Sequence, residues 1–160
     1  MRRYIRPAAL AVLGIVTFTP VALGQTLEWA TSAGGINSDR GLGIATTERG
    51  DSYVTGLFEG TATFGQGEPN ETTLTHAGLG DIFVAKYDRD GALLWVTSAG
   101  GTDFEQGLGI ATTARGDGYV TRWFIGTATF GQGEPNETTL TSEEADSPQA
   151  EGDIFVAKYR

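Results

Sequence analysis

The sequence predicts an all-β protein built from two copies of one repeat. Long stretches of the chain return with nearly the same letters, and each copy holds four short segments rich in β-branched and aromatic residues. Turn residues separate these segments, and no part of the chain after residue 24 keeps an apolar period of 3.6 residues. We therefore expect short antiparallel strands in each copy and no helix beyond residue 24.

The N-terminus has the pattern of a secretory signal peptide. Arg2, Arg3 and Arg6 precede an apolar run over residues 8–18, and small residues stand just before position 25. The run is shorter than the ~20 apolar residues that a membrane-spanning helix needs. We expect cleavage after Gly24, a secreted, periplasmic or cell-surface location, and no membrane span in the cleaved chain.

The repeat is exact over part of its length. Residues 60–75 are identical to residues 126–141, which stand 66 positions later. Residues 80–87 return at 152–159, now 72 positions later, because six extra residues lie within 142–151. That polar, acidic stretch is typical of a lengthened surface loop.

The offsets divide the chain into a signal peptide, residues 1–24, and a repeat region, residues 25–160. We expect the copies over about 36–101 and 102–160. Residues 27–35 match the end of the first copy, so they predict an additional N-terminal outer strand.

Each copy has the composition of a β-propeller blade. The innermost segment is lined with small residues, and residues 82–85 are apolar on both faces, as in a strand sandwiched between neighbours. Gly50 and Gly91 lie in linkers of hairpin length. In the first copy we expect four strands, over residues 43–47, 52–58, 81–87 and 93–98.

The motifs of these strands resemble the bacterial SBBP β-propeller repeat family. The matching stretches are Gly-Leu-Gly-Ile-Ala at 41–45, Tyr-Val-Thr-Gly at 53–56, Asp-Ile-Phe-Val-Ala-Lys-Tyr-Asp at 81–88, and Gly100-Gly101. The second copy departs at Arg122, which replaces a glycine. The resemblance implies an exported or cell-surface bacterial protein with repeated blades, and it brings no shared catalytic residues.

Two blades are too few for a closed ring, because known propellers have at least about four. The repeat region begins on a fourth-strand segment, 27–33, and the sequence ends just after a third-strand segment. Three hypotheses follow. Chains could assemble through the N-terminal strand, the chain could be a truncated relative of a longer propeller, or the two blades could stand alone as an incomplete propeller with exposed edges.

The charge and the cysteine count exclude some roles. The formal net charge is -9, with 20 acidic residues against 11 Lys and Arg. Such a chain repels nucleic acid and anionic lipid, so we expect no nucleic-acid partner. There is no cysteine, and the fold must be held by strand pairing and packing without disulfides.

Candidate catalytic and metal-binding groups are few. His76 is the only histidine, and no Ser/His/Asp set can be built around it. Residues 88–91 faintly resemble a calcium loop, but Asp and Gly at that place serve a turn between two strands. We therefore predict no enzyme activity, no cofactor and no metal.

The sequence favours a non-enzymatic, exported binding or scaffold module with a protein or carbohydrate ligand, whose ligand-binding residues stay unknown. One alternative is a lectin-like oligomer with aromatic sites, and another is a fragment of a larger repeat protein without activity of its own. The least favoured is a hydrolase or lyase that uses loop carboxylates. The residues concerned are Trp29, Trp95 and Trp123 for the lectin, and Glu143, Glu144, Asp146 and Glu151 for the hydrolase or lyase.

Overall fold

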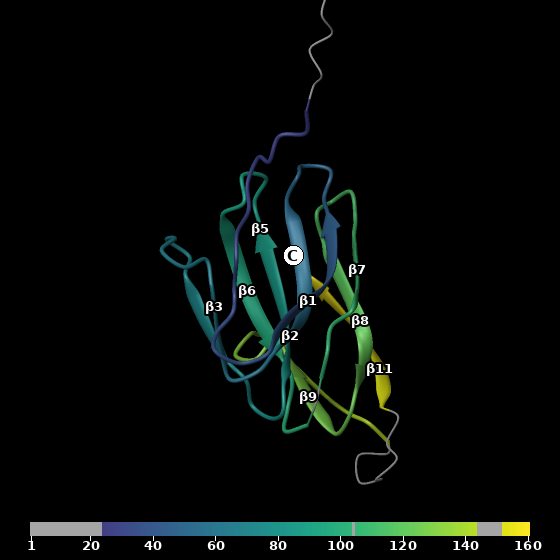
Figure 1. The fold of residues 1–160 in the computed structure, drawn as a ribbon. Coiled ribbons are helices and arrows are strands. Elements are labelled where there is room, and N and C mark those ends of the chain that lie inside the picture. Colours follow the sequence, from purple (N-terminus) through teal and green to yellow (C-terminus); the bar gives the residue numbers. More distant parts are fainter. Residues whose placement is uncertain (1–23, 104, 144–151) are drawn as a thin grey trace, which may run out of the picture.

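The computed structural model describes residues 24–103, 105–143 and 152–160, and they form an all-β, antiparallel structure (Figure 1). The fold class predicted from the sequence is confirmed at this level, and none of the sheets closes on itself. The predicted signal peptide lies almost wholly outside the described residues. Within the ranges described, no helix has the length and apolar character needed to cross a bilayer.

The first repeat forms a four-stranded antiparallel sheet in the order β1-β2-β5-β6. The strands are β1 (Asp39–Thr46), β2 (Ser52–Phe58), β5 (Asp81–Tyr87) and β6 (Leu93–Ala99). The four predicted segments are therefore confirmed as strands, although β1 begins earlier than expected. A register shift between Gly41 and Gly43 explains the early start, because β1 continues its pairing with β2 past this irregularity.

The second repeat forms a sheet of only three strands. Its order is β11-β8-β7, from β7 (Gly109–Thr112), β8 (Gly118–Phe124) and β11 (Asp153–Tyr159). Of the two four-stranded blades that the repeat predicts, only the first therefore has four strands among the described residues; the second lacks its outer strand, as expected from a sequence that ends just after a third-strand segment. The segment whose sequence matches β6 is 27–33, and it lies against the first repeat instead of beside β11.

Each repeat also contains a two-stranded hairpin that lies outside the four predicted strand segments. The hairpins pair β3 (Thr61–Phe64) with β4 (Thr72–Thr75), and β9 (Thr127–Phe130) with β10 (Thr138–Thr141). They form because Thr-Ala-Thr-Phe alternates in period two and buries its alanine and phenylalanine. The threonine hydroxyls meet across the outer face, with 2.9 Å between Oγ1 of Thr63 and Oγ1 of Thr73.

Two apolar clusters hold these elements together. One lies between the first sheet and its own hairpin and contains Phe64, Phe83 and Leu93. The other joins the two repeats, because Ile82 and Val84 of β5 pack with residues of β8, β9 and β11. The two faces of β5 are therefore both covered, as the apolar run at 82–85 predicted.

Residues 27–33 form no strand in the structure, so the predicted N-terminal outer strand is not paired there. The segment is anchored at its end, where Gly34 and Thr63 exchange two backbone hydrogen bonds of 3.1 and 3.0 Å. Trp29 fixes a second point, because its Nε1 donates a hydrogen bond to the Arg89 carbonyl. The segment could pair only with a free sheet edge, but beside β5 in the nearby first sheet that place is already taken by β6.

One carboxyl group is buried where the repeats meet. The Glu105 side chain is fully buried, and its Oε2 accepts a hydrogen bond from the Gly101 N–H at 3.2 Å. In the first repeat, Oδ2 of Asp39 accepts the corresponding hydrogen bond from the Gly35 N–H, at 2.7 Å. Burial is the main cause that raises the pKa of Glu105 to about 7; the Gly101 hydrogen bond opposes this rise, and the negative charges of Asp81 and Asp103 add to it.

Because the pKa of Glu105 is raised in the folded protein, we expect the protein to lose stability as the pH rises from about 4.5 to about 7. In that window the folded protein keeps a proton that the unfolded chain releases, so the free energy of unfolding falls with increasing pH. Glu105→Gln keeps a hydrogen-bond acceptor without the charge. We expect this variant to lose up to about 3 kcal/mol of that pH dependence in urea unfolding between pH 5 and 8.

The exposed Glu48→Gln serves as the control, and its profile should match that of the unsubstituted chain. Equal slopes for Glu105→Gln and the unsubstituted chain would contradict the assignment.

Candidate functional site

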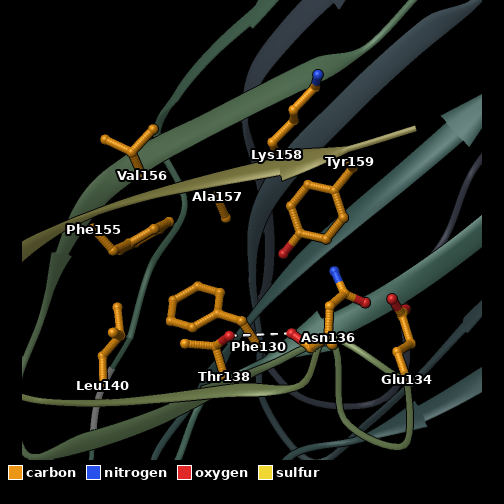
Figure 2. A pocket seen from close by; sticks show the side chains of 11 residues that line it. Phe130, Glu134, Asn136, Thr138, Leu140, Phe155, Val156, Ala157, Lys158 and Tyr159 are labelled. Carbon is orange, nitrogen blue, oxygen red and sulfur yellow. Dashed lines mark hydrogen bonds between the residues drawn. The ribbon is translucent and has the colours of Figure 1, made fainter.

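A cavity of about 340 Å³ lies between β11 and the β9–β10 hairpin of the second repeat (Figure 2). One end is apolar, because the rings of Phe130 and Phe155 lie beside Leu140. The other end is polar. It is lined by Glu134, Asn136, Lys158 and Tyr159.

The polar end presents both a hydrogen-bond acceptor and donors. Figure 2 shows Glu134 and Asn136 on the hairpin loop, across from the Tyr159 ring on β11. Burial, and then the negative charge of Glu134, raise the pKa of Tyr159 to about 12, so its hydroxyl stays protonated at neutral pH. The backbone N–H and C=O groups of an extended chain would complement this acceptor and these donors.

The same place in the first repeat is filled by Leu93 of β6. Leu93 is 2% exposed and packs in the cluster with Phe64, Phe83 and Tyr87. The fit is close, because a Cβ atom added at Gly65 would lie 2.8 Å from Cδ2 of Leu93. For a Cβ atom added at Gly131, the counterpart of Gly65, the nearest atoms belong to the Glu134 side chain, at 3.5 Å or more.

The first repeat also shows how its loop binds a backbone. The Leu93 N–H donates a hydrogen bond of 2.6 Å to Oε2 of Glu68, and Nδ2 of Asn70 donates one of 3.0 Å to the Leu93 carbonyl. Glu134 and Asn136 are the counterparts of these two side chains. They line the cavity of the second repeat instead of holding a strand.

The two hairpin loops have the same internal hydrogen bonds, so the loop of the cavity is preformed. The Glu68 N–H donates to the Gly65 carbonyl at 2.8 Å, and the Glu134 N–H donates to the Gly131 carbonyl at 2.9 Å. A glutamate further along each loop accepts a bond from a glycine N–H, at 2.6 Å in the first repeat and 2.7 Å in the second.

Next to the cavity, β11 leaves one edge unpaired within the described residues. β5 pairs with β2 on one side and β6 on the other, whereas β11 pairs with β8 alone. On the opposite face of the strand, Ile154 and Val156 are 81% and 70% exposed, while their counterparts Ile82 and Val84 are buried. We use the word socket for the space between the third strand and the hairpin of each repeat, which Leu93 fills in the first repeat and which is the cavity in the second. An exposed sheet edge beside a formed socket is a template for a further strand.

The three tryptophans of the sequence analysis do not share one set of contacts. Trp95 packs edge-on against Tyr53, with 5.7 Å between ring centroids, and lies 6.1 Å from the Tyr159 ring. Trp123 lies under the Arg122 guanidinium, and Trp29 holds the turn after β5. Of the three, Trp95 is the one that reaches the neighbourhood of the cavity.

The acidic loop gives little to a catalytic interpretation. The Glu143 N–H donates a hydrogen bond to Oδ2 of Asp153, while Glu144, Asp146 and Glu151 lie outside the described residues. Over the described ranges, no three His, Cys, Asp or Glu side chains are grouped so that they could hold a metal ion. Asp88 accepts hydrogen bonds from the N–H groups of Asp90 and Ala92, which is the turn that the sequence predicted.

Sequence reasoning missed the cavity, although a signal for it exists. Leu27 and Leu93 occupy the same position of the repeat, and residues 60–75 and 126–141 are identical. The two identical loop segments, together with the two leucines at one position of the repeat, are the signal that could have pointed to the site. Without the hairpin fold, however, neither Glu134 nor Asn136 stood out from other loop residues.

Leu93→Ala tests the packing of the filled socket. We expect it to lower the free energy of unfolding by about 2–5 kcal/mol, because it removes a buried side chain from a tight contact. Leu94→Ala is the matched control, since Leu94 is 39% exposed and should change stability by about 0.5 kcal/mol or less. Chemical denaturation measures both. Equal effects would show that the socket does not hold Leu93 as described.

No protein-family model matches this chain, and no curated protein matches it either. The resemblance to SBBP repeats therefore stays an expectation that rests on the motifs quoted above.

Proposed function

We propose that this chain is an exported, non-enzymatic binding and scaffold module of the β-propeller type, which recognises an extended polypeptide by adding it as a strand to β11. The observation that carries the proposal is the pair of equivalent sockets. In one of them Glu68 and Asn70 bind the backbone of a strand, and in the other Glu134 and Asn136 are free to do so. Strand addition to an open edge is a common mode of peptide recognition.

Backbone pairing would supply the affinity in this mode, and the socket would supply the selectivity. The Glu134 carboxylate and the Asn136 amide fit the N–H and C=O of one ligand residue, while Phe130, Phe155 and Leu140 form the floor for its side chain. An aliphatic residue such as leucine has the matching shape, because Leu93 fills the equivalent place. The ligand is then a peptide with one leucine that enters the cavity.

The propeller-type architecture is supported by the strand order. In the first repeat β1, β2, β5 and β6 pair in sequence order apart from the inserted hairpin, which is the order of a propeller blade. The stacking of the second sheet on β5 through Ile82 and Val84 is also what neighbouring blades require. Export is supported by the basic start and apolar run of residues 1–24.

A carbohydrate ligand is the second candidate, and one hollow favours it. Trp95, Lys158, Tyr159 and Arg160 line a mostly polar hollow beside the cavity. An aromatic face with polar neighbours suits a sugar ring. If a glycan binds and Trp95→Ala abolishes that binding while peptide binding is absent, this candidate replaces the first.

A synthetic peptide with the sequence of residues 92–101 tests the proposed function, because that segment fills the equivalent site in the first repeat. We expect saturable binding by calorimetry at low chain concentration. Glu134→Ala should weaken it about 10–100-fold, as expected for a lost hydrogen bond of about 1.5–3 kcal/mol to a charged group.

The matched control is Glu48→Ala, an exposed glutamate in the turn between β1 and β2, which should bind as the unsubstituted chain does. Equal binding of a scrambled peptide, or no effect of Glu134→Ala, would refute recognition at this site.

A further inference from the structure

The segment before β1 has the sequence and the position of a strand that lacks its sheet. We propose that residues 27–33 of a second copy of this chain form the strand that pairs with β11, with Leu27 in the cavity, so that copies join head to tail. The inference rests on the proposed strand addition, and it names the occupant.

The first argument is the likeness of the segment to β6. Residues 27–33 read Leu-Glu-Trp-Ala-Thr-Ser-Ala and β6 reads Leu-Leu-Trp-Val-Thr-Ser-Ala, so only two positions differ. Glu28 stands at the place of Leu94, which is part-exposed, and Ala30 at that of Val96, where a smaller side chain also fits. The segment therefore carries, as Leu27, the same residue that fills the socket of the first repeat as Leu93.

The second argument is that the segment is held ready. Gly34 bonds to Thr63 on β3, and Gly100, directly after β6, bonds to Thr129 on β9 in the same way. Residues 27–34 are thus attached to the hairpin of the first repeat in the same way that β6 and Gly100 are attached to the hairpin of the second repeat. All side chains over 27–33 are exposed, and Leu27 is 79% exposed.

The third argument is the register, which the first sheet dictates. There Lys86 pairs with Trp95, Ala85 with Val96, and Val84 with Thr97. Transferred to the junction, Lys158 lies opposite Trp29, Ala157 opposite Ala30, and Val156 opposite Thr31.

Beyond this ladder, β6 has a register shift that places Leu93 opposite Tyr87. Leu27 then lies opposite Tyr159, where its N–H can donate to Glu134 and its carbonyl can accept from Asn136. The cavity has the same two groups in the same loop geometry as the filled socket.

A second copy fits better than the same chain folded back on itself. Gly34 is tied to the first repeat at Thr63, so residues 27–33 start beside β3. Figure 1 shows this segment, in purple, running past β6 and β3 at the left of the view, while β11, in yellow, runs from the right edge of the view to the C-terminus near its centre. The donor segment and the acceptor edge are different surfaces, which makes the contact heterologous.

The same junction would also cover two other apolar surfaces. Ile44 on β1 is 64% exposed, whereas its counterpart Ile110 on β7 packs against the cluster that joins the two repeats. Ile154 and Val156 on β11 are exposed, whereas Ile82 and Val84 on β5 belong to that cluster. A second copy placed as the second repeat is placed on the first would bring these surfaces together.

Because the chain has no cysteine, introduced pairs report directly on the register. We expect chains with Ala30→Cys, mixed with chains with Ala157→Cys, to form a disulfide-linked heterodimer under mild oxidation, seen by non-reducing electrophoresis and peptide mass spectrometry. The control pairs Thr31→Cys with Ala157→Cys, whose side chains leave opposite faces, and it should cross-link at least several-fold less.

The double variant Ala30→Cys, Ala157→Cys separates contact between copies from contact within one chain. A ladder of linked chains supports the inference. A cross-linked monomer overturns it, and so does the absence of any cross-link. If the peptide of residues 92–101 binds at Glu134 while no cross-link forms, the proposed function stands and this occupant is wrong; if neither happens, both are wrong.

Leu27→Asp gives an independent readout without oxidation. The side chain is exposed in the single chain, so the fold should persist, as circular dichroism would show. We expect sedimentation to show monomers for this variant and oligomers for the control Leu79→Asp, whose leucine is 67% exposed elsewhere. A monomeric unsubstituted chain across the micromolar range, or oligomers of Leu27→Asp, would overturn the inference.

Discussion

The structure of the first repeat depends on how its hairpin loop holds the backbone of the outer strand β6. In the first repeat Glu68 and Asn70 hold both polar groups of Leu93, and the leucine side chain closes the cluster between sheet and hairpin. The loop thereby joins β6 to β3 and β4, which share no strand ladder with it. A charged acceptor in a partly buried place gives a stronger bond than a neutral one, so this contact fixes the register of the edge strand.

Identical sequences end in different surroundings because a different strand neighbourhood lies beside each hairpin. Residues 60–75 and 126–141 fold into the same hairpin, but one encloses a leucine and the other an open cavity. The difference arises outside the hairpins, from which strand lies beside β5 or β11. In proteins built of stacked repeats, stability is shared between the units and their interfaces.

Much of the sheet could be predicted from the sequence, because its strands carry strong local signals. The apolar run at 82–85 and the glycines of the turns place β2 and β5 at their observed bounds. The hairpins were missed because four residues of alternation between threonines give a weak signal, and only burial of Ala62 and Phe64 against the sheet makes them strands. The environment of Glu105 was equally out of reach, since its burial depends on packing between two repeats.

The charge of the chain limits how such open surfaces can be used. A formal charge of -9 makes unspecific contact between copies unfavourable, which reduces the aggregation risk of an open edge such as β11. Yet the edge itself is locally basic, because Lys158 and Arg160 lie at its end, and only Asp117 is shown pairing with them. An approaching strand with an acidic residue, such as Glu28, meets favourable charge there and repulsion over most of the remaining surface. Selective pairing at one edge is therefore compatible with an acidic chain, because attraction is confined to the place where a backbone can also be bound.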